Sequence, residues 1–481
     1  MIIKLIVIAL YAAMIITIGV IGMRKTHSFN DFFLGGGKVG PWMTAFSYGT
    51  AYFSAVLFIG FAGKIGWNFG YSGLWIALFN ALVGVLVVWG VFGWKIKQIS
   101  IKFKVSTMCE YLEKRYNSPF LKLSGAIVIF IFMIPYSAAV FMGLSYMFTS
   151  NFNLEYWHAL SFIGIFTASY IVLGGYKSMA MIDMIFGIIM TIGVIILYFS
   201  TVNEGGGMAM ITNTLKAIEP KLTAAVGPPG FWPLFSLIFL TSVAPFAMPQ
   251  LVQKFYAIRD RRSIRIGMIA STFFALLVGG VAYYIGSTTR IFLSPGDPEF
   301  AHVFNAGVPI YDRLMPELLA KVIPESLSVI ILLLILSASM STLAALVLIS
   351  SSSLIKDFYH GFVNKNASDR KLTRLMRIGS AFFVFLSVIL AWMDLDTIVS
   401  ILGISWGALG SFFLGPFIWG ILWKRAGKAG AISSGVIGLG TCLVLYAMGM
   451  PSPSAGTIGM ITSLVINPIV SLIIEKREQS A

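Results

Sequence analysis

The sequence has 481 residues, of which 58% are hydrophobic and only 11% are charged. A soluble globular domain has about 25% charged residues, so this composition excludes that class and predicts a protein that lies in the lipid bilayer. The net charge of +15 does not indicate a nucleic-acid partner, because Lys and Arg gather in the cytoplasmic loops of membrane proteins.

Runs of about 20 apolar residues can cross a bilayer as helices, and helices satisfy their own backbone hydrogen bonds there. We count thirteen such runs and expect an all-α polytopic membrane protein whose residues 1–481 form one transmembrane domain. The predicted spans are 2–23, 41–65, 72–92, 123–149, 157–173, 181–201, 231–252, 266–287, 322–355, 372–392, 398–422, 429–448 and 456–474.

The loops between these spans predict the orientation of the chain. With the N-terminus outside, most of the 34 Lys and Arg residues fall in cytoplasmic loops, including the basic run from Lys254 to Arg265. Because positive residues accumulate on the cytoplasmic side, we expect a multi-pass protein of the inner (plasma) membrane with an external N-terminus and a cytoplasmic C-terminus.

Two of the predicted spans are poor continuous helices. The second contains Ser47-Tyr48-Gly49-Thr50 midway, and the seventh contains Pro245 and Pro249. Proline removes a helix hydrogen bond and glycine lowers helix propensity, so both spans should break near the membrane centre. They lie five spans apart, which predicts an inverted pair of repeats over about 41–201 and 231–422, with a binding site at the breaks. Unrelated kinks are the alternative.

The ninth span places Ala338, Ser341 and Thr342 on one helical face, at i, i+3 and i+4. One carbonyl and two hydroxyls would converge there, and a broken second span would add free carbonyls around Thr50 and Phe53. Neutral oxygen ligands suit a weakly bound monovalent cation that must also leave. The alternative is that these hydroxyls simply bond to carbonyls one turn back or pack as small side chains.

Short motifs accompany these features along nearly the whole chain. They are Phe29-Asn30-Asp31-Phe32-Phe33-Leu34-Gly35-Gly36, Gly49-Thr50-Ala51-Tyr52-Phe53-Ser54, Gly174-Gly175 with Asp183, Pro249, Met340-Ser341-Thr342, Lys356-Asp357-Phe358-Tyr359, Gly415-Pro416 and Trp423-Lys424-Arg425. With them the chain resembles the sodium:solute symporter family, which includes proline, pantothenate, sialic acid and sugar symporters. The resemblance implies a leucine-transporter-type fold of two inverted five-helix repeats, with one helix before them and two after.

The resemblance also implies ion sites. The family's sodium site corresponds to the carbonyls of Thr50, Phe53 and Ala338 and the hydroxyls of Ser341 and Thr342, and sodium is the only metal ion expected. Asp183 corresponds to an acid that contributes to a second ion site in some members. The alternative for Asp183 is an acid at a helix start, which the helix dipole favours.

By position, seven residues on or near the broken helices are expected to contact the solute: Tyr52, Ser54, Ala55, Tyr136, Thr241, Pro245 and Trp406. Proline symporters have an acid in the place of Tyr52 and aromatic residues in the places of Thr241 and Pro245. Sugar symporters have a carboxylate in the third span, where this chain has Asn80 as its sizeable amide. A compact zwitterion, such as an amino acid, or a monocarboxylate fits these residues.

We therefore expect a sodium-coupled symporter that imports a small polar organic solute, such as proline or a monocarboxylate, by alternating access. Its partners would be the solute, sodium and lipid, with no nucleic acid and no obligate protein partner. The alternatives are a solute sensor and a sodium-independent or proton-coupled carrier of the same fold. A channel is a further alternative, whereas an enzyme is not expected, because no metal cluster or nucleophile-base pair is evident.

Overall fold

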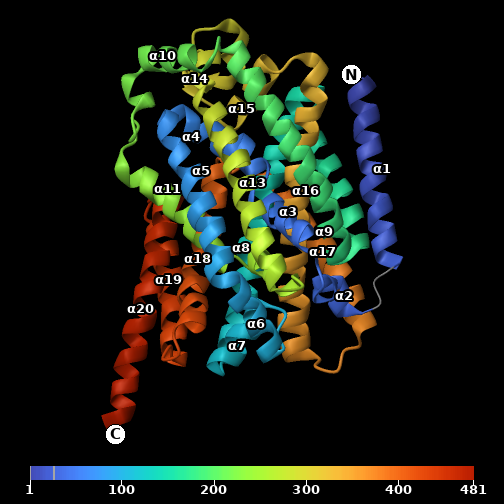
Figure 1. Ribbon diagram of the computed structural model, residues 1–481, viewed down its shortest axis with the longest axis vertical. Coiled ribbons are helices and arrows are strands. Elements are labelled where there is room, and N and C mark those ends of the chain that lie inside the picture. Colours follow the sequence, from blue (N-terminus) through green and yellow to red (C-terminus); the bar gives the residue numbers. More distant parts are fainter. Residues whose placement is uncertain (1, 25–27, 481) are drawn as a thin grey trace.

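The computed structural model describes residues 2–24 and 28–480, without the side chains of 170–174 and 475–480. Most helices run along the long axis of the molecule (Figure 1). The first half contains α1 (Ile2–Arg24), α2 (Phe29–Leu34), η1 (Gly35–Gly37), α3 (Pro41–Tyr52), η2 (Val56–Phe61), α4 (Ala62–Phe69), η3 (Gly70–Gly73), α5 (Leu74–Phe79), η4 (Asn80–Gly93), α6 (Trp94–Phe103), α7 (Met108–Tyr116), α8 (Pro119–Phe152), α9 (Tyr156–Glu204), α10 (Met208–Ile218) and η5 (Pro220–Thr223).

The second half is also helical, apart from two short paired strands. It contains α11 (Phe231–Val243), η6 (Ala244–Ala247), α12 (Pro249–Ala257), α13 (Arg261–Ser287), α14 (Thr289–Phe292), η7 (Pro298–Val303), β1 (Phe304–Asn305), β2 (Val308–Pro309), α15 (Tyr311–Val322), η8 (Glu325–Leu327), α16 (Ser328–Ser352), η9 (Ser353–Val363), α17 (Asp369–Trp392), α18 (Ile398–Leu422), α19 (Lys428–Ala447) and α20 (Ser452–Ser480). The strands pair antiparallel, with Phe304 opposite Pro309.

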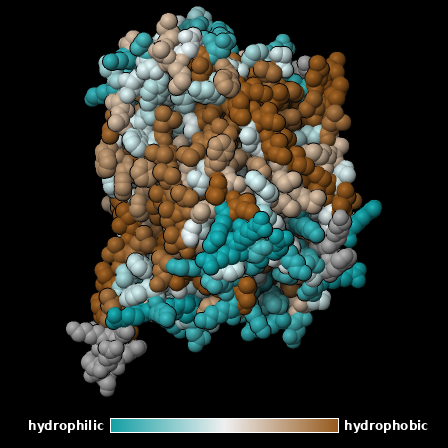
Figure 2. All heavy atoms as spheres, in the orientation of Figure 1, coloured by the Kyte–Doolittle hydropathy of each residue, from teal (hydrophilic) through white to brown (hydrophobic). Residues whose placement is uncertain are grey.

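The face of the bundle that Figure 2 shows is largely apolar across its middle. Figure 2 shows hydrophobic residues over the central zone and hydrophilic residues towards the two ends. Large apolar side chains such as Ile165, Phe199 and Phe385 are well exposed. Lipid chains cover such a surface in a membrane protein, so the exposed apolar zone marks the part of the molecule that lies in the bilayer.

Within the described residues, ten helices are long and apolar enough to cross a membrane, or eleven if the bent pair Phe231–Ala247 and Pro249–Ala257 forms one span. We expected thirteen. Part of the difference is the stretch Val56–Phe103, which counts once but holds the end of the second predicted span and all of the third. These two parts meet at Gly70, whose φ of +57° suits a residue without a side chain.

The fifth and sixth predicted spans also lie in one element, α9. This 49-residue element is broken at Gly175, where φ is 65° and ψ is 179°. Only Gly175–Glu204 qualifies as a span, and residues 170–174 before it lie outside the described side chains. The sixth span therefore begins several residues before the predicted start at Met181. The boundaries of the two expected repeats stay a prediction.

Close backbone contact holds α4 against α13. Gly66 and Gly286 face each other so tightly that a Cβ on Gly286 would lie 2.1 Å from the carbonyl oxygen of Ala62. Membrane helices associate through such small-residue contacts, since lipid provides no hydrophobic drive between helices. This contact positions α4, which holds the end of the predicted span 41–65.

We expect Gly286→Ala to lower the thermal midpoint of the purified protein by several degrees, because overpacking costs about 1–3 kcal/mol and backbone atoms cannot turn aside. Gly280→Ala is the matched control, since it lies on the same helix and its added Cβ would meet nothing within 4 Å. Thermal unfolding in detergent measures both. Equal midpoints for the two variants would contradict the close contact.

A buried carboxyl group joins the outer helix α15 to the start of α18. The Asp312 carboxylate accepts the backbone N–H of Ile398 at 3.0 Å and is 5% exposed. Burial raises the pKa of Asp312 to about 7, although the Ile398 N–H and nearby Lys64 act in the opposite direction. The folded protein therefore binds a proton at Asp312 more readily than the unfolded chain does.

Because the folded pKa of Asp312 lies above the unfolded value of about 3.9, its contribution to stability falls as pH rises from about 4 to about 7. The slope is at most about 1.4 kcal/mol per pH unit. We expect Asp312→Asn to keep the acceptor for Ile398 and to remove this part of the pH dependence. Thermal midpoints between about pH 4 and pH 7, the range that the shift spans, measure it, and an unchanged slope in the variant would refute the assignment.

Candidate functional site

The first broken helix interrupts at Phe53 and Ser54. Helix α3 ends at Tyr52, and Phe53 is extended, with φ −106° and ψ 100°. The break expected in this span is present, but it lies three residues after the Ser47-Tyr48-Gly49-Thr50 motif, through which α3 is continuous. Gly49 instead lets α13 approach, since a Cβ on it would lie 2.5 Å from the Phe274 ring. Close packing of this kind offsets the cost of placing glycine in a helix, which is only about 1 kcal/mol relative to alanine.

The second broken helix interrupts at Met248, between η6 and α12. Met248 is extended, with φ −78° and ψ 117°, and the two parts meet at 41°. The interruption falls between Pro245 and Pro249, as the sequence predicts. Both breaks lie inside the bundle, where backbone groups without helix partners can face a cavity or an ion rather than lipid.

Oxygen atoms of α3 and α16 gather beside the first break. The Thr342 hydroxyl lies 3.1 Å from both the Thr50 carbonyl and the Ala338 carbonyl, and it can donate its single hydrogen to either. The Ser341 hydroxyl donates to the Thr50 hydroxyl at 2.7 Å. We call these groups of Thr50, Ala338, Ser341 and Thr342 the α3–α16 oxygen cluster. All four residues are buried.

The structure brings together four of the five residues predicted to bind sodium. Phe53 is the fifth, and its side chain lines a neighbouring cavity, while its N–H donates to the Gly49 carbonyl. The Ala51 carbonyl, which the sequence did not single out, lies 3.5 Å from the Thr342 hydroxyl. Thr342 fits both interpretations of these hydroxyls. It lies near the Ala338 carbonyl one turn back on its own helix, and it also contacts the Thr50 carbonyl of α3.

Asp183 is fully buried and does not lie at a helix start. It follows the break at Gly175 by eight residues, about two turns into the helix. Its Oδ2 accepts a hydrogen bond from Ser47 of α3 at 2.5 Å, and Lys254 of α12 lies 3.8 Å away. The location of Lys254 corrects the sequence analysis, which placed it in a cytoplasmic loop. Helix α12 extends to Ala257, and Lys254 is 0% exposed.

A small cavity lies between the two broken helices and their neighbours. Its volume is about 30 Å³, and its described lining residues carry no charged side chain. They are Tyr52, Phe53, Ser54, Val56, Leu57, Phe61, Asn80, Tyr136, Thr241, Tyr283, Leu402 and Trp406. The cavity thus includes five of the seven residues predicted to contact the solute, namely Tyr52, Ser54, Tyr136, Thr241 and Trp406.

The other two predicted contacts are absent from this lining. Ala55 packs towards α8, where a Cβ on Gly143 would lie 3.3 Å from the Ala55 Cβ. Pro245 is buried within η6. Sequence reasoning missed Tyr283 and the apolar lining residues Val56, Leu57, Phe61 and Leu402, and it used Asn80 only to argue against sugars. A lone amide in an apolar span is itself a signal, because polar groups are rare there.

Aromatic rings form one side of the cavity. Tyr52 stacks on Trp406 with ring centroids 5.9 Å apart and planes at 14°, and Tyr136 meets Trp406 edge-on at 5.7 Å. The Trp406 indole nitrogen is buried without a hydrogen-bond acceptor in the part of the chain that the structure describes. These rings offer apolar faces and an N–H group to a bound molecule.

Polar groups on the other side join the second broken helix to η4. The Tyr52 hydroxyl donates to the Thr241 carbonyl at 2.5 Å. The hydroxyls of Thr241 and Ser242 both donate to Asn80 Oδ1 at 2.8 Å. Two of these bonds end on Asn80 Oδ1, so the Asn80 amide lies among neutral hydroxyl groups.

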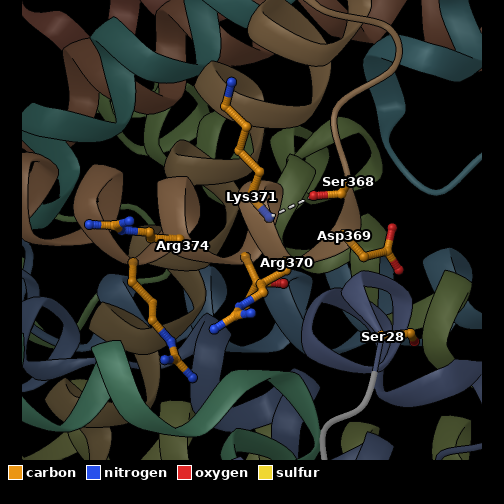
Figure 3. Close-up of a pocket in the computed structure, with 8 residues that line it drawn as sticks. Ser28, Ser368, Asp369, Arg370, Lys371 and Arg374 are labelled. Carbon is orange, nitrogen blue, oxygen red and sulfur yellow. Dashed lines mark hydrogen bonds between the residues drawn. The ribbon is translucent and has the colours of Figure 1, made fainter.

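A wider hollow, about 930 Å³, opens at the surface where α17 begins. It is lined by Ser28, Ser368, Asp369, Arg370, Lys371, Thr373, Arg374 and Arg377. Figure 3 shows that the Lys371 and Arg370 side chains extend in different directions rather than towards one point. Asp369 accepts the N–H of Phe29, which joins α17 to α2. This hollow is remote from the helix breaks in the chain and is basic, unlike the neutral cavity.

Residues 32–438 match the sodium:solute symporter family. The chain belongs to this family. The symporter is 27% identical over 447 residues to the high-affinity proline transporter PutP of Bacillus subtilis, covering 90% of each chain. It is 25% identical to the osmoregulated proline transporter OpuE of the same organism, over 97% of this chain and 93% of the relative. It is also 25% identical to the sodium/pantothenate symporter of Haemophilus influenzae, over 94% and 93% of the two chains.

Solved structures show the same fold. A sodium-coupled sialic acid symporter in a substrate-bound outward-open state superposes with a TM-score of 0.82 at 17% identity, covering 98% of this chain and 97% of that one. MhsT in complex with L-phenylalanine gives 0.54 at 14% identity, over 90% and 99%. The symporter therefore has the leucine-transporter-type fold, and its family makes it a sodium-coupled solute transporter and not an enzyme.

Proposed function

We propose that the symporter imports a compact zwitterion such as proline, or a small monocarboxylate, by alternating access driven by the sodium gradient. The observation that carries the proposal is the α3–α16 oxygen cluster, in which the Thr342 hydroxyl lies 3.1 Å from the carbonyls of both Thr50 and Ala338. The cluster lies directly beside the break at Phe53 and Ser54, and both of these residues line the neutral cavity.

The cluster has the chemistry of a site for a small monovalent cation. A hydroxyl has one donor hydrogen and two acceptor lone pairs, so Ser341 and Thr342 can turn their hydrogens aside and present oxygen to an ion. Carbonyls and hydroxyls do not titrate near neutral pH, so the cluster itself suits sodium rather than a proton. The Phe53 carbonyl, two residues beyond Ala51, would join after a small change in the extended segment.

Coupling follows from the position of the break. Thr50 belongs to the ion cluster, whereas Tyr52 and Ser54, within the next four residues, line the solute cavity. Sodium that orders Thr50 would therefore order the solute wall as well. By linkage, a solute that orders the same segment raises the affinity for sodium by the same factor.

The cavity indicates a solute with balanced charge. No charged side chain is among its described lining residues, so an ionic solute would need its charge matched by helix ends and amides. The helical half starting after Ser54 presents its N-terminus to the cavity, and helix N-termini bind carboxylates. Ala55 would then contribute a backbone N–H, while the ring faces of Tyr52 and Trp406 hold an apolar body. The names of the proline transporters among the relatives agree with this class.

Solute entry requires movement of the lining. The cavity of about 30 Å³ holds roughly one water molecule, whereas small-molecule pockets usually have about 300–1,000 Å³. The stacked rings of Tyr52 and Trp406 come from different elements, α3 and α18. Separation of these elements, as alternating access demands, would open the space.

The proposed location is the inner (plasma) membrane, with the N-terminus outside and the C-terminus in the cytoplasm. The start of α1 and the end of α20 lie at opposite ends of the molecule (Figure 1), which agrees with an odd number of crossings. The basic hollow at the start of α17 lies at the end we assign to the cytoplasm, in agreement with the positive-inside rule.

Replacing Ser341 and Thr342 together by alanine removes both side-chain ligands of the proposed ion site. We expect sodium-driven solute uptake into proteoliposomes to fall at least about 100-fold, since each lost ligand to a charged group is worth about 1.5–3 kcal/mol. Ser339→Ala is the matched control, because its buried hydroxyl bonds only to Ile335 of its own helix. Retained sodium dependence in the double variant would refute this site.

A thermal-shift screen of the purified protein identifies the solute class. Amino acids, monocarboxylates, sugars and vitamins would be compared in sodium and in potassium chloride. A ligand at 100 times its Kd stabilises the folded state by about 2.7 kcal/mol, and we expect this for a zwitterion or monocarboxylate in sodium alone. Equal stabilisation in both salts would favour a sodium-independent or proton-coupled carrier. Binding without flux in proteoliposomes would indicate a sensor.

A further inference from the structure

Lys254 and Asp183 form a buried pair next to the proposed sodium site. The Lys254 side chain is 0% exposed, and its ammonium donates to the Ser47 hydroxyl at 2.7 Å. The Ser47 hydroxyl in turn donates to Asp183 Oδ2 at 2.5 Å. The ammonium also lies 5.2 Å from the centre of the Tyr176 ring. A lysine in the interior of a membrane bundle is costly and calls for a functional reason.

The geometry differs from that of a direct salt bridge. The ammonium and the carboxylate are 3.8 Å apart, with the Ser47 hydroxyl between them, and Asp183 Oδ1 has no hydrogen-bond donor among the described residues. Buried carboxylates usually have both oxygens paired. Asp183 therefore retains an unpaired oxygen, and its charge is balanced by an ammonium that is held 3.8 Å away through the Ser47 hydroxyl.

The pair is continuous with the α3–α16 oxygen cluster. Ser47 and Thr50 are three residues apart on α3, hence on one helical face, and Ser341 of the cluster also interacts with the Asp183 side chain. Lys254 is thus a fixed positive charge next to the proposed sodium site. The Asp183 carboxylate, the Ser47 hydroxyl of α3 and the Ser341 hydroxyl of α16 meet at this place.

We propose that the Lys254 ammonium occupies the place of a second sodium ion beside Asp183, so that the symporter binds one sodium ion per cycle. The inference rests on the proposed sodium site at the α3–α16 oxygen cluster and extends it. A mobile cation near Asp183 would be repelled by the ammonium in a medium of low dielectric, where like charges interact strongly. Removing the ammonium leaves Asp183, Ser47 and Ser341 able to bind sodium instead.

The experiment counts radioactive sodium bound to the purified, full-length protein in detergent, by a scintillation proximity assay. We expect one ion for the wild type and two for Lys254→Gln, and we expect the second ion to be lost again in Lys254→Gln combined with Asp183→Asn. The variant is purified in sodium chloride, because the ion that replaces the ammonium should also raise its thermal midpoint more steeply than that of the wild type.

Lys97→Gln is the matched control, because Lys97 is also buried and its ammonium donates to the carbonyl of Tyr256 at 3.0 Å, among carbonyls alone. It should bind one ion. Two ions on the wild type, or one ion on folded Lys254→Gln, would overturn the inference. No ion on the wild type would instead refute the proposed sodium site, so the two failures are distinct.

If Lys254→Gln does not fold, the ratio of sodium to solute transported by the wild type in proteoliposomes decides the matter. A ratio of one supports the inference, whereas a ratio of two overturns it. Lys254→Arg keeps the positive charge and provides a further check, since it should retain the ratio of one.

Discussion

The whole site depends on one constraint, which is that backbone groups inside a membrane must find partners. A continuous helix uses all of its carbonyls internally. The extended residue Phe53 ends α3 early, and the carbonyls of Thr50 and Ala51 turn to the Thr342 hydroxyl of α16. Without the break, α3 and α16 would share only side-chain packing. With the break, backbone carbonyls of α3 lie within hydrogen-bond distance of the Thr342 hydroxyl of α16.

The same constraint explains how ion and solute come to share a segment. The break supplies carbonyls on the side of α16 and a new helix start on the side of the cavity. Under the proposed function, a few residues would therefore contact both ligands, and binding of either ligand would restrain the same backbone segment. Glycine contacts such as Gly66 with Gly286 pack the helical half after the break closely against α13.

Sequence patterns predicted what depends on composition and spacing. The apolar runs, the break between Pro245 and Pro249, and the common face of Ala338, Ser341 and Thr342 are local features, and each appears in the structure. The first break was misplaced, because tight packing of Gly49 against Phe274 keeps the helix intact. Helix counts differed where a turn at Gly70 or Gly175 leaves the chain helical on both sides.

Long-range relations were beyond the sequence. In the sequence, Lys254 is the first charge of a predicted basic loop. In the structure it belongs to α12, which is buried in the bundle and places Lys254 near Asp183. The partners of Asn80 likewise come from α11, more than 150 residues away. Spacing within one helix cannot reveal such pairs, since they arise from how distant helices pack.

The buried ammonium of Lys254 bears on how far the symporter can concentrate its solute. With a zwitterion and one sodium ion, each cycle moves one net charge, which a membrane potential of about 100 mV drives with about 2.3 kcal/mol. A tenfold sodium gradient adds about 1.4 kcal/mol. The sum corresponds to an accumulation ratio of about 500, and a second sodium ion would square that ceiling. If the proposed stoichiometry holds, a single lysine would lower the concentrating power and also lower the ion cost per molecule taken up.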